Sequence, residues 1–158
     1  MRTEDIVLRP TTEADREFLL LVYEASRQEE LDQVAWPPGQ REWFVRMQFD
    51  AQDQEYRRLS PHAAFDVIEV GGRPAGRLYV DRGADDALRI IDIALLPEFR
   101  GAGIGGRLIK ELQEEAAASG RTVTLHVEVH NRAVRLYERL GFVGADAEGV
   151  YRAMAWTP

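Results

Sequence analysis

The architecture of this chain follows from one segment, Leu96-Pro97-Glu98-Phe99-Arg100-Gly101-Ala102-Gly103-Ile104-Gly105-Gly106. It joins a run of β-branched and aliphatic residues at 88–96 to a segment with helical spacing that begins near Gly103. Four glycines in its last six positions let the backbone come close to a ligand. The first helical turn directs unpaired N–H groups and the positive end of the helix dipole at that ligand, so we expect a pyrophosphate there.

The segments on either side predict an alternation of strands and helices. On the N-terminal side we expect strands at 6–9, 64–70, 75–80 and 88–96, and helices from Thr12 onward and over 40–58. On the C-terminal side we expect a helix from 103 to a cap at Gly120, a strand at 122–129, a helix at 131–140, and strands at 142–145 and 150–156.

Helical spacing also predicts which side chains face the core. The expected apolar stripes are Phe18, Leu21, Val22 and Ala25 in the first helix, Trp43, Phe44, Met47 and Ala51 in the second, and Ile104, Leu108, Ile109, Leu112 and Ala116 in the third. The whole pattern predicts an α/β sandwich with a mixed sheet, formed as a single domain by residues 1–158.

Composition excludes several classes of protein and of site. With 45% apolar and 30% charged residues, the 158 residues have the make-up of a packed globular domain. The chain has no cysteine, which excludes a thiol nucleophile, a disulfide framework and an iron–sulfur cluster. The three histidines, His62, His126 and His130, lack the spacing of metal ligands, so we expect no metal site.

The charge distribution argues against some partners. A net charge of −7 is unfavourable for binding nucleic acid. No apolar run reaches the roughly 18–20 residues of a membrane helix, and no secretory signal is visible, so we expect a cytoplasmic protein without a membrane partner. Residues 1–60 hold 8 basic and 13 acidic groups, a net −5, which either attracts a cationic substrate or only solvates the surface.

A dinucleotide-binding interpretation of the glycines is weaker. Gly101, Gly103 and Gly106 match G-x-G-x-x-G, and Glu128 lies near the end of the following strand. That fingerprint should open a series of βαβ units, however, and here too few residues follow it. The indication of a phosphate site remains, whereas the indication of NAD is weak.

The sequence resembles the GCN5-related N-acetyltransferase (GNAT) family. The family's loop has the pattern Arg/Gln-x-x-Gly-x-Gly/Ala, which Arg100, Gly103 and Gly105 match here. The segments Leu96–Phe99 and Leu136–Phe142 also resemble the family. The resemblance implies a mixed, mostly antiparallel central sheet flanked by helices, and acetyl-CoA as the co-substrate.

The resemblance also implies how acetyl-CoA would be bound. The backbone of Ile93 and Leu95 would pair with pantetheine, and one of their N–H groups would polarise the thioester carbonyl. The pyrophosphate would be held by backbone N–H groups of the loop, from Gly101 through Gly103, Ile104, Gly105 and Gly106, with Arg100 and Arg107 as nearby cations. Asn131 would contact pantetheine, although it lies six residues before Tyr137 where the family commonly has seven, so His130 is the alternative.

The resemblance implies that Tyr137 is the acid that protonates the departing thiolate, while a buried structural tyrosine is the alternative. His126 is the candidate base, with a structural role in the strand about equally favoured, and Glu128 shares its face. Asp92, an acid in an apolar strand, is expected first in an ion pair and second as a base. Glu29 and Glu30 either bind an amine or solvate a helix end.

The function expected from these features is transfer of an acetyl group from acetyl-CoA to the primary amine of a small molecule or peptide by direct attack. The absence of cysteine excludes an acetyl-cysteine intermediate. The alternatives are a catalytically silent CoA-binding module on the same fold and a Rossmann-type nucleotide binder. Whether the protein forms a homodimer stays open.

Overall fold

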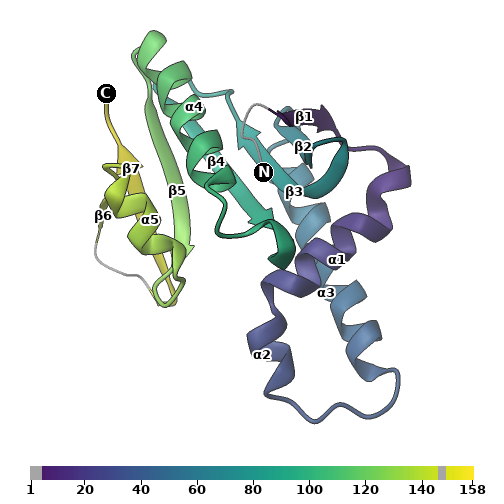
Figure 1. Ribbon diagram of the computed structural model, residues 1–158. Helices are drawn as coiled ribbons and strands as arrows, with labels where there is room; N and C mark the ends of the chain where they lie inside the picture. Colours follow the sequence, from purple (N-terminus) through teal and green to yellow (C-terminus); the bar gives the residue numbers. More distant parts are fainter. Residues whose placement is uncertain (1–4, 146–148) are drawn as a thin grey trace.

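A seven-stranded sheet in the order β1-β2-β3-β4-β5-β7-β6 runs through the computed structural model, which describes residues 5–145 and 149–158 (Figure 1). All neighbouring strands are antiparallel except β4 and β5, which are parallel. The predicted mixed, mostly antiparallel sheet is therefore confirmed. The strands are β1 (Ile6–Pro10), β2 (Ala64–Val70), β3 (Arg73–Asp81), β4 (Ala87–Leu95), β5 (Thr122–Glu128), β6 (Val143–Gly144) and β7 (Tyr151–Trp156).

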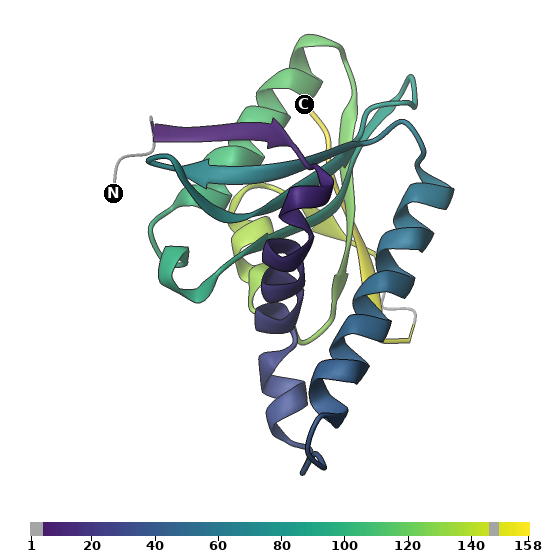
Figure 2. The same cartoon turned by 90° about the vertical axis from the view of Figure 1, so that its right-hand side faces the viewer.

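The helices flank this sheet in the predicted chain order. They are α1 (Arg16–Ser26), α2 (Gln28–Asp32), α3 (Gln40–Leu59), α4 (Ile104–Ala118) and α5 (Ala133–Arg139). Helix α2, which falls in the acidic run after α1, was not predicted. Figure 2 shows α1 and α3 side by side in front of the sheet. Among the described residues, no helix has both the length and the apolar character needed to cross a membrane.

The predicted start of the first helix at Thr12 is confirmed. The Thr12 backbone N–H donates to Asp15 Oδ2 at 2.8 Å, and a short 3₁₀ turn (Glu13–Asp15) leads into α1. Arg9 of β1 donates to both oxygens of the same carboxylate, at 2.8 and 2.9 Å. These bonds hold the pKa of Asp15 down at about 2, because Arg9 favours the charged form. Asp15 thus joins the first strand to the first helix.

Two apolar clusters form the core, and they correct part of the predicted packing. The stripe predicted for α4 is buried, and it packs against sheet residues such as Leu88 and Leu125. The second cluster joins α1, α2 and α3 through side chains such as Leu19, Leu31 and Phe49. Four predicted core residues are instead exposed, Leu21 in α1 and Trp43, Met47 and Ala51 in α3, where Val45 and Phe49 are buried in their place. The prediction was wrong there because Phe18–Val22 and Trp43–Val45 are continuous apolar runs, in which periodicity cannot select one face.

The sheet splits between β4 and β5. The two strands pair over only four positions, from Ala87 opposite Thr122 to Ile90 opposite Leu125. Directly afterwards β4 carries an extra residue, Ile91, because Val80 of β3 lies opposite Ile90 while Tyr79 lies opposite Asp92. Such a bulge bends its strand. Beyond it, β4 and β5 diverge, and the gap between their C-terminal halves is visible in Figure 1.

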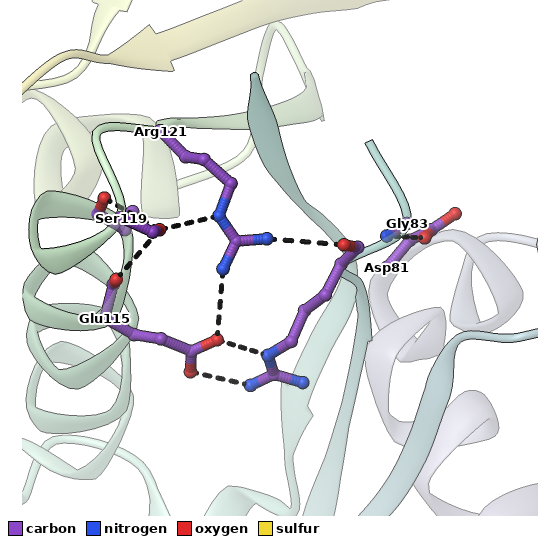
Figure 3. A network of polar contacts seen from close by, with 7 residues as sticks. Asp81, Gly83, Glu115, Ser119 and Arg121 are labelled. Atoms are coloured by element: carbon purple, nitrogen blue, oxygen red, sulfur yellow. Dashed lines mark hydrogen bonds and ion pairs between the residues drawn. The ribbon is translucent and has the colours of Figure 1, made fainter. Parts of the chain in front are cut away.

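A polar network connects the C-terminal end of α4 to the sheet (Figure 3). Arg82, which follows β3, donates to the carboxylate of Glu115, with Nη2 at 3.0 Å from Oε1. Arg121 donates to Ser119 Oγ at 2.8 Å and to the Arg82 carbonyl oxygen at 3.3 Å. The C-terminal end of α4 is thereby fixed, while its N-terminal end borders the gap in the sheet.

Candidate active site

The C-terminal half of β4 directs backbone N–H groups into the gap, and no described strand pairs with it on that side. The N–H of Leu96 donates to the Ala75 carbonyl of β3 at 2.8 Å. Because successive N–H groups of a strand alternate in direction, those of Ala94 and Asp92 also point to β3. The N–H groups of Ile93 and Leu95 therefore point to the opposite edge, where β5 has diverged. The structure thus places these two predicted residues where an extended ligand could pair with them.

The glycine loop closes one end of the gap and contains two kinds of glycine. Gly101 and Gly103 have φ angles of +76° and +80°, a conformation that other residues rarely adopt. Gly105 lies in the first turn of α4 without such an angle, and a Cβ added there would meet no atom within 4 Å. Gly105 is therefore not required for the turn. Its lack of a side chain keeps the backbone N–H groups of this turn open to a ligand.

Three hollows meet in the gap and share Ile93, Ala94 and Tyr137. The loop cavity, about 460 Å³, extends from these residues to Gly101, Gly103, Ile104, Gly105 and Gly106. The central cavity, about 520 Å³, is bordered by Glu29, Glu30, Arg100, His130 and Asn131. The sheet cavity, about 200 Å³, is bordered by Tyr56, Arg77, Asp92, His126 and Glu128. The hollows form one cleft that runs through the split sheet. Except for Arg107, every residue predicted to act in catalysis or in acetyl-CoA binding borders one of them.

Tyr137 lies where the three hollows meet. It extends from α5, is only 7% exposed, and its ring packs edge-on against Phe142 with centroids 5.7 Å apart. Burial, assisted by the negative charge of Asp92, raises the pKa of Tyr137 to about 12. The hydroxyl therefore stays protonated at neutral pH, as a proton donor must.

His126 and Glu128 border the sheet cavity from β5. Both side chains lie on the strand face opposite the buried Leu125 and Val127. Glu128 accepts a hydrogen bond from Arg27 Nη1 at 2.7 Å, an ion pair across the cleft to the junction of α1 and α2. His126 is exposed and shares the sheet cavity with Tyr137. The predicted acid and base thus border the same hollow.

Asp92 forms the predicted buried ion pair, and its partner was missed in the sequence. The partner is Arg77 of β3, which is only 2% exposed and also donates to Gln52 Oε1 of α3 at 2.8 Å. Burial together with the charge of Asp92 raises the pKa of the neighbouring Tyr56. Arg77 could have been noticed, because it is the one charged residue within the apolar run Ala75–Val80. What was missing from the sequence was the strand register that joins it to Asp92.

Of the remaining predicted residues, Asn131, His130 and Arg100 border the cleft, whereas Arg107 does not. Asn131 Oδ1 accepts a hydrogen bond from the Ala133 N–H at 2.8 Å and so helps to begin α5. The side-chain NH₂ group of Asn131 takes no part in this bond. Asn131 borders both the central and sheet cavities, whereas His130 borders only the former of these two. Arg100 Nε donates to the Leu95 carbonyl at 3.0 Å. Arg107 is paired with Glu111 at 3.0 Å.

The acidic surplus of residues 1–60 is largely neutralised locally. Glu29 and Glu30 do border the central cavity, but each has an arginine partner at 3.5 Å, Arg132 and Arg27 respectively. Other carboxylates of this region are paired with arginines outside the cleft, including Asp15, Glu17, Glu24, Asp32, Asp50, Asp53 and Glu55. Among the described residues, Glu29 and Glu30 are the only carboxylates that the central cavity offers a cationic acceptor in addition to those of the sheet cavity.

Comparison with known proteins connects this cleft to a family. Residues 28–142 match the acetyltransferase (GNAT) family. A mycothiol acetyltransferase of Corynebacterium glutamicum is 31% identical over 120 residues, which cover 73% of this chain and 39% of that protein. A putative ribosomal protein bS18-alanine N-acetyltransferase of Bacillus subtilis is 36% identical over 96 residues, covering 57% of this chain and 62% of the relative. The chain spans about two fifths of the length of the first curated relatives it matches.

The fold has counterparts among solved structures. The PaiA N-acetyltransferase of Thermoplasma acidophilum, crystallised in complex with coenzyme A, superposes with a TM-score of 0.72 at 19% identity, over 97% of this chain and 99% of that one. An acetyltransferase of Thermus thermophilus gives a TM-score of 0.72 at 18% identity, with both chains covered completely. At this level of identity the likeness concerns the fold.

Proposed function

Because this chain belongs to the GNAT family of acetyltransferases, we propose that it transfers the acetyl group of acetyl-CoA directly to a primary amine of a small molecule or peptide. One observation carries the proposal. The split between β4 and β5 opens a continuous cleft from the glycine loop, past the free edge of β4, to Tyr137. A long ligand with an anionic end and an amide-containing arm suits this shape.

From one end of the cleft to the other, its residues suit the successive parts of acetyl-CoA. The open backbone at Gly105 and the N–H groups of the first turn of α4 suit a pyrophosphate. The outward N–H groups of Ile93 and Leu95 suit the amides of pantetheine, and Asn131 lies on the facing side. Acetyl-CoA would supply the reactive acetyl thioester. One N–H of Ile93 or Leu95 would donate to the thioester oxygen, where negative charge develops during attack.

Two side chains of the cleft would move the protons. His126 accepts the proton that the amine nitrogen loses as its bond to the acetyl carbon forms. Tyr137 donates its proton to sulfur as the carbon–sulfur bond breaks. The raised pKa of Tyr137, about 12, keeps that proton in place until the thiolate appears. Asp92, held by Arg77, adds a fixed negative charge beside both groups.

The proposal is tested by two measurements on the purified protein. Calorimetry with acetyl-CoA and with NAD should show binding of the former alone. Release of CoA in the presence of a panel of amines can be followed with a thiol-reactive dye, and the cysteine-free chain contributes no thiol to this signal. Binding of acetyl-CoA without CoA release from any amine would leave the silent CoA-binding module. Binding of NAD without acetyl-CoA would reject both.

A further inference from the structure

A fourth hollow, the helix groove, lies outside the cleft described above. It occupies about 410 Å³ between α1, α2 and α3. Its floor consists of the buried side chains of Tyr23, Leu31 and Val45. Trp36 and Phe44 pack against each other along the groove, with their ring centroids 5.2 Å apart. Apolar and aromatic side chains form most of the lining of the groove, whereas charged and polar side chains dominate the sheet and central cavities.

A hydrogen bond orders one side of the groove. The indole N–H of Trp36 donates to the Leu31 carbonyl at 2.8 Å, which fixes the ring against the end of α2. At the rim, Val34 is 50% exposed and borders the groove. A ligand that covered Val34 and the two rings would therefore remove apolar surface from water without first ordering the groove.

The groove adjoins the cleft, and two charged residues border both of them. Arg27 borders both the groove and the sheet cavity, and Glu30 borders both the groove and the central cavity. Arg27 is the one residue between α1 and α2, and its guanidinium lies 5.9 Å from the ring centroid of Tyr23 while it donates to Glu128. Arg27 and Glu30 therefore lie between the cleft, whose carboxylates suit an ammonium group, and the apolar helix groove.

We propose that the helix groove binds the apolar substituent of the acceptor, so that the preferred acceptors are primary amines carrying an aliphatic or aromatic group. This inference rests on the proposed function. The amine end lies in the cleft near Glu128 and Tyr137, and the apolar end passes Arg27 into the groove, where it packs against the rings of Trp36 and Phe44. Because the groove adjoins the cleft at Arg27 and Glu30, we assign it to the acceptor rather than to another protein.

The first test is a series of straight-chain primary amines of increasing length, compared with the same chains ending in a hydroxyl. All members present the same aliphatic amino group, so the chemistry at nitrogen stays constant along the series. Each methylene that enters the groove should lower KM by about three- to fourfold, the factor that corresponds to burial of one CH₂. The terminal hydroxyl should cancel most of this gain for the chains that reach the groove.

The second test changes the groove itself. Val34→Asp places a carboxylate at the rim and should abolish the dependence of KM on chain length, while KM for the shortest amine stays unchanged. Gln48→Leu, which extends the apolar wall, should make the dependence steeper. Met47→Asp is the matched control, because Met47 is 41% exposed on the same helix but does not border the groove. This control should leave the series unchanged.

The outcomes separate this inference from the proposed function. Equal KM values along the series, or equal effects of Val34→Asp and Met47→Asp, overturn the inference while acetyl transfer stands. Transfer to none of the amines overturns it as well, and calorimetry with acetyl-CoA then decides independently whether the cofactor half of the proposed function survives. A dimer in sedimentation velocity that Val34→Asp dissociates would assign the groove to a second copy of the chain and also overturn the inference.

Discussion

The hydroxyl of Tyr137 can be tested by removing a single oxygen. Tyr137→Phe keeps the ring that packs on Phe142, so the free energy of unfolding should fall by only about 1 kcal/mol. If the hydroxyl protonates the departing thiolate, kcat should fall by about 10²–10⁴-fold with little change in KM for acetyl-CoA. Initial rates of CoA release measure this directly.

A matched control and the pH profile make the test specific. Tyr151→Phe removes a hydroxyl from a 46% exposed tyrosine of the same sheet cavity, and it should leave kcat nearly unchanged. Because the pKa of Tyr137 is raised to about 12, the acid stays protonated from neutral to mildly alkaline pH, and the wild-type rate should not fall there on its account. A lower melting temperature with an intact kcat would show that Tyr137 is structural.

A substitution at Gly105 tests whether the ligand needs access to the backbone of this turn, without changing the conformation of the turn. Gly105→Val should weaken acetyl-CoA binding by more than about tenfold, because its side chain would project into the open space above the first turn of α4. Substitution at Gly103 would be less informative, since its φ of +80° makes any side chain strained. Lys110→Val, an exposed position of the same helix, controls for the effect of a β-branched residue on the helix. Calorimetry should find unchanged affinity in this control, and unchanged affinity in Gly105→Val would remove the pyrophosphate assignment.

At the scale of elements, the Arg77–Asp92 pair joins β3 to β4 at the bulge. Asp92→Leu leaves the buried Arg77 charge without its partner and should lower the free energy of unfolding by about 3–5 kcal/mol. Replacing both residues with apolar ones should recover much of this loss, because no isolated charge is then buried. Urea unfolding of the two single variants and the double variant measures the coupling. Additive losses would show that the two side chains do not stabilise each other.

The start of the first helix should make stability depend on pH. The folded pKa of Asp15 is about 2, below its ordinary value of 3.8, so the stabilisation it provides is complete above the ordinary value and is lost as the pH falls through the folded one. Asp15→Asn should lower the free energy of unfolding at neutral pH by about 1–2 kcal/mol and flatten this acid-side dependence. Unfolding at a series of pH values tests it. Glu13→Gln, exposed in the same turn, should change neither quantity.

The order of elements and the glycine loop could be predicted because their signals are local. Pro97, the glycines and the α4 stripe each act within a few residues of themselves. Contacts between distant residues could not be predicted in this way. Arg27 and Glu128 are 101 residues apart, and Arg77 and Asp92 meet only through the register of two strands. The exposure of Leu21 and Trp43 likewise depends on how α1 and α3 pack, which their continuous apolar runs leave undecided.

At the scale of the whole molecule, a ligand bound in the split sheet should stabilise the fold by contacting both parts of the sheet. Strands β1 to β4 meet strands β5 to β7 through only four residue pairs, and acetyl-CoA would contact both sides of the gap. At a concentration of acetyl-CoA about 100 times its Kd, the free energy of unfolding should rise by about 2.7 kcal/mol. Hydrogen exchange should slow at Ile93 and Leu95, whose N–H groups face the gap. Exchange unchanged at these two amides, despite saturation, would place the ligand elsewhere.

The split in the sheet also separates strands that are synthesised early from strands that are synthesised late. Strands β1 to β4 come from residues 6–95, and β5 to β7 come from residues 122–156. The antiparallel part can pair by itself as soon as β4 has left the ribosome, whereas β5 needs α4 to cross over before parallel pairing starts. One wall of the cleft therefore exists before the other has been translated. A nascent chain carries the free edge of β4 for the time needed to translate α4 and β5, and during that interval it is a strand edge that another chain could pair with.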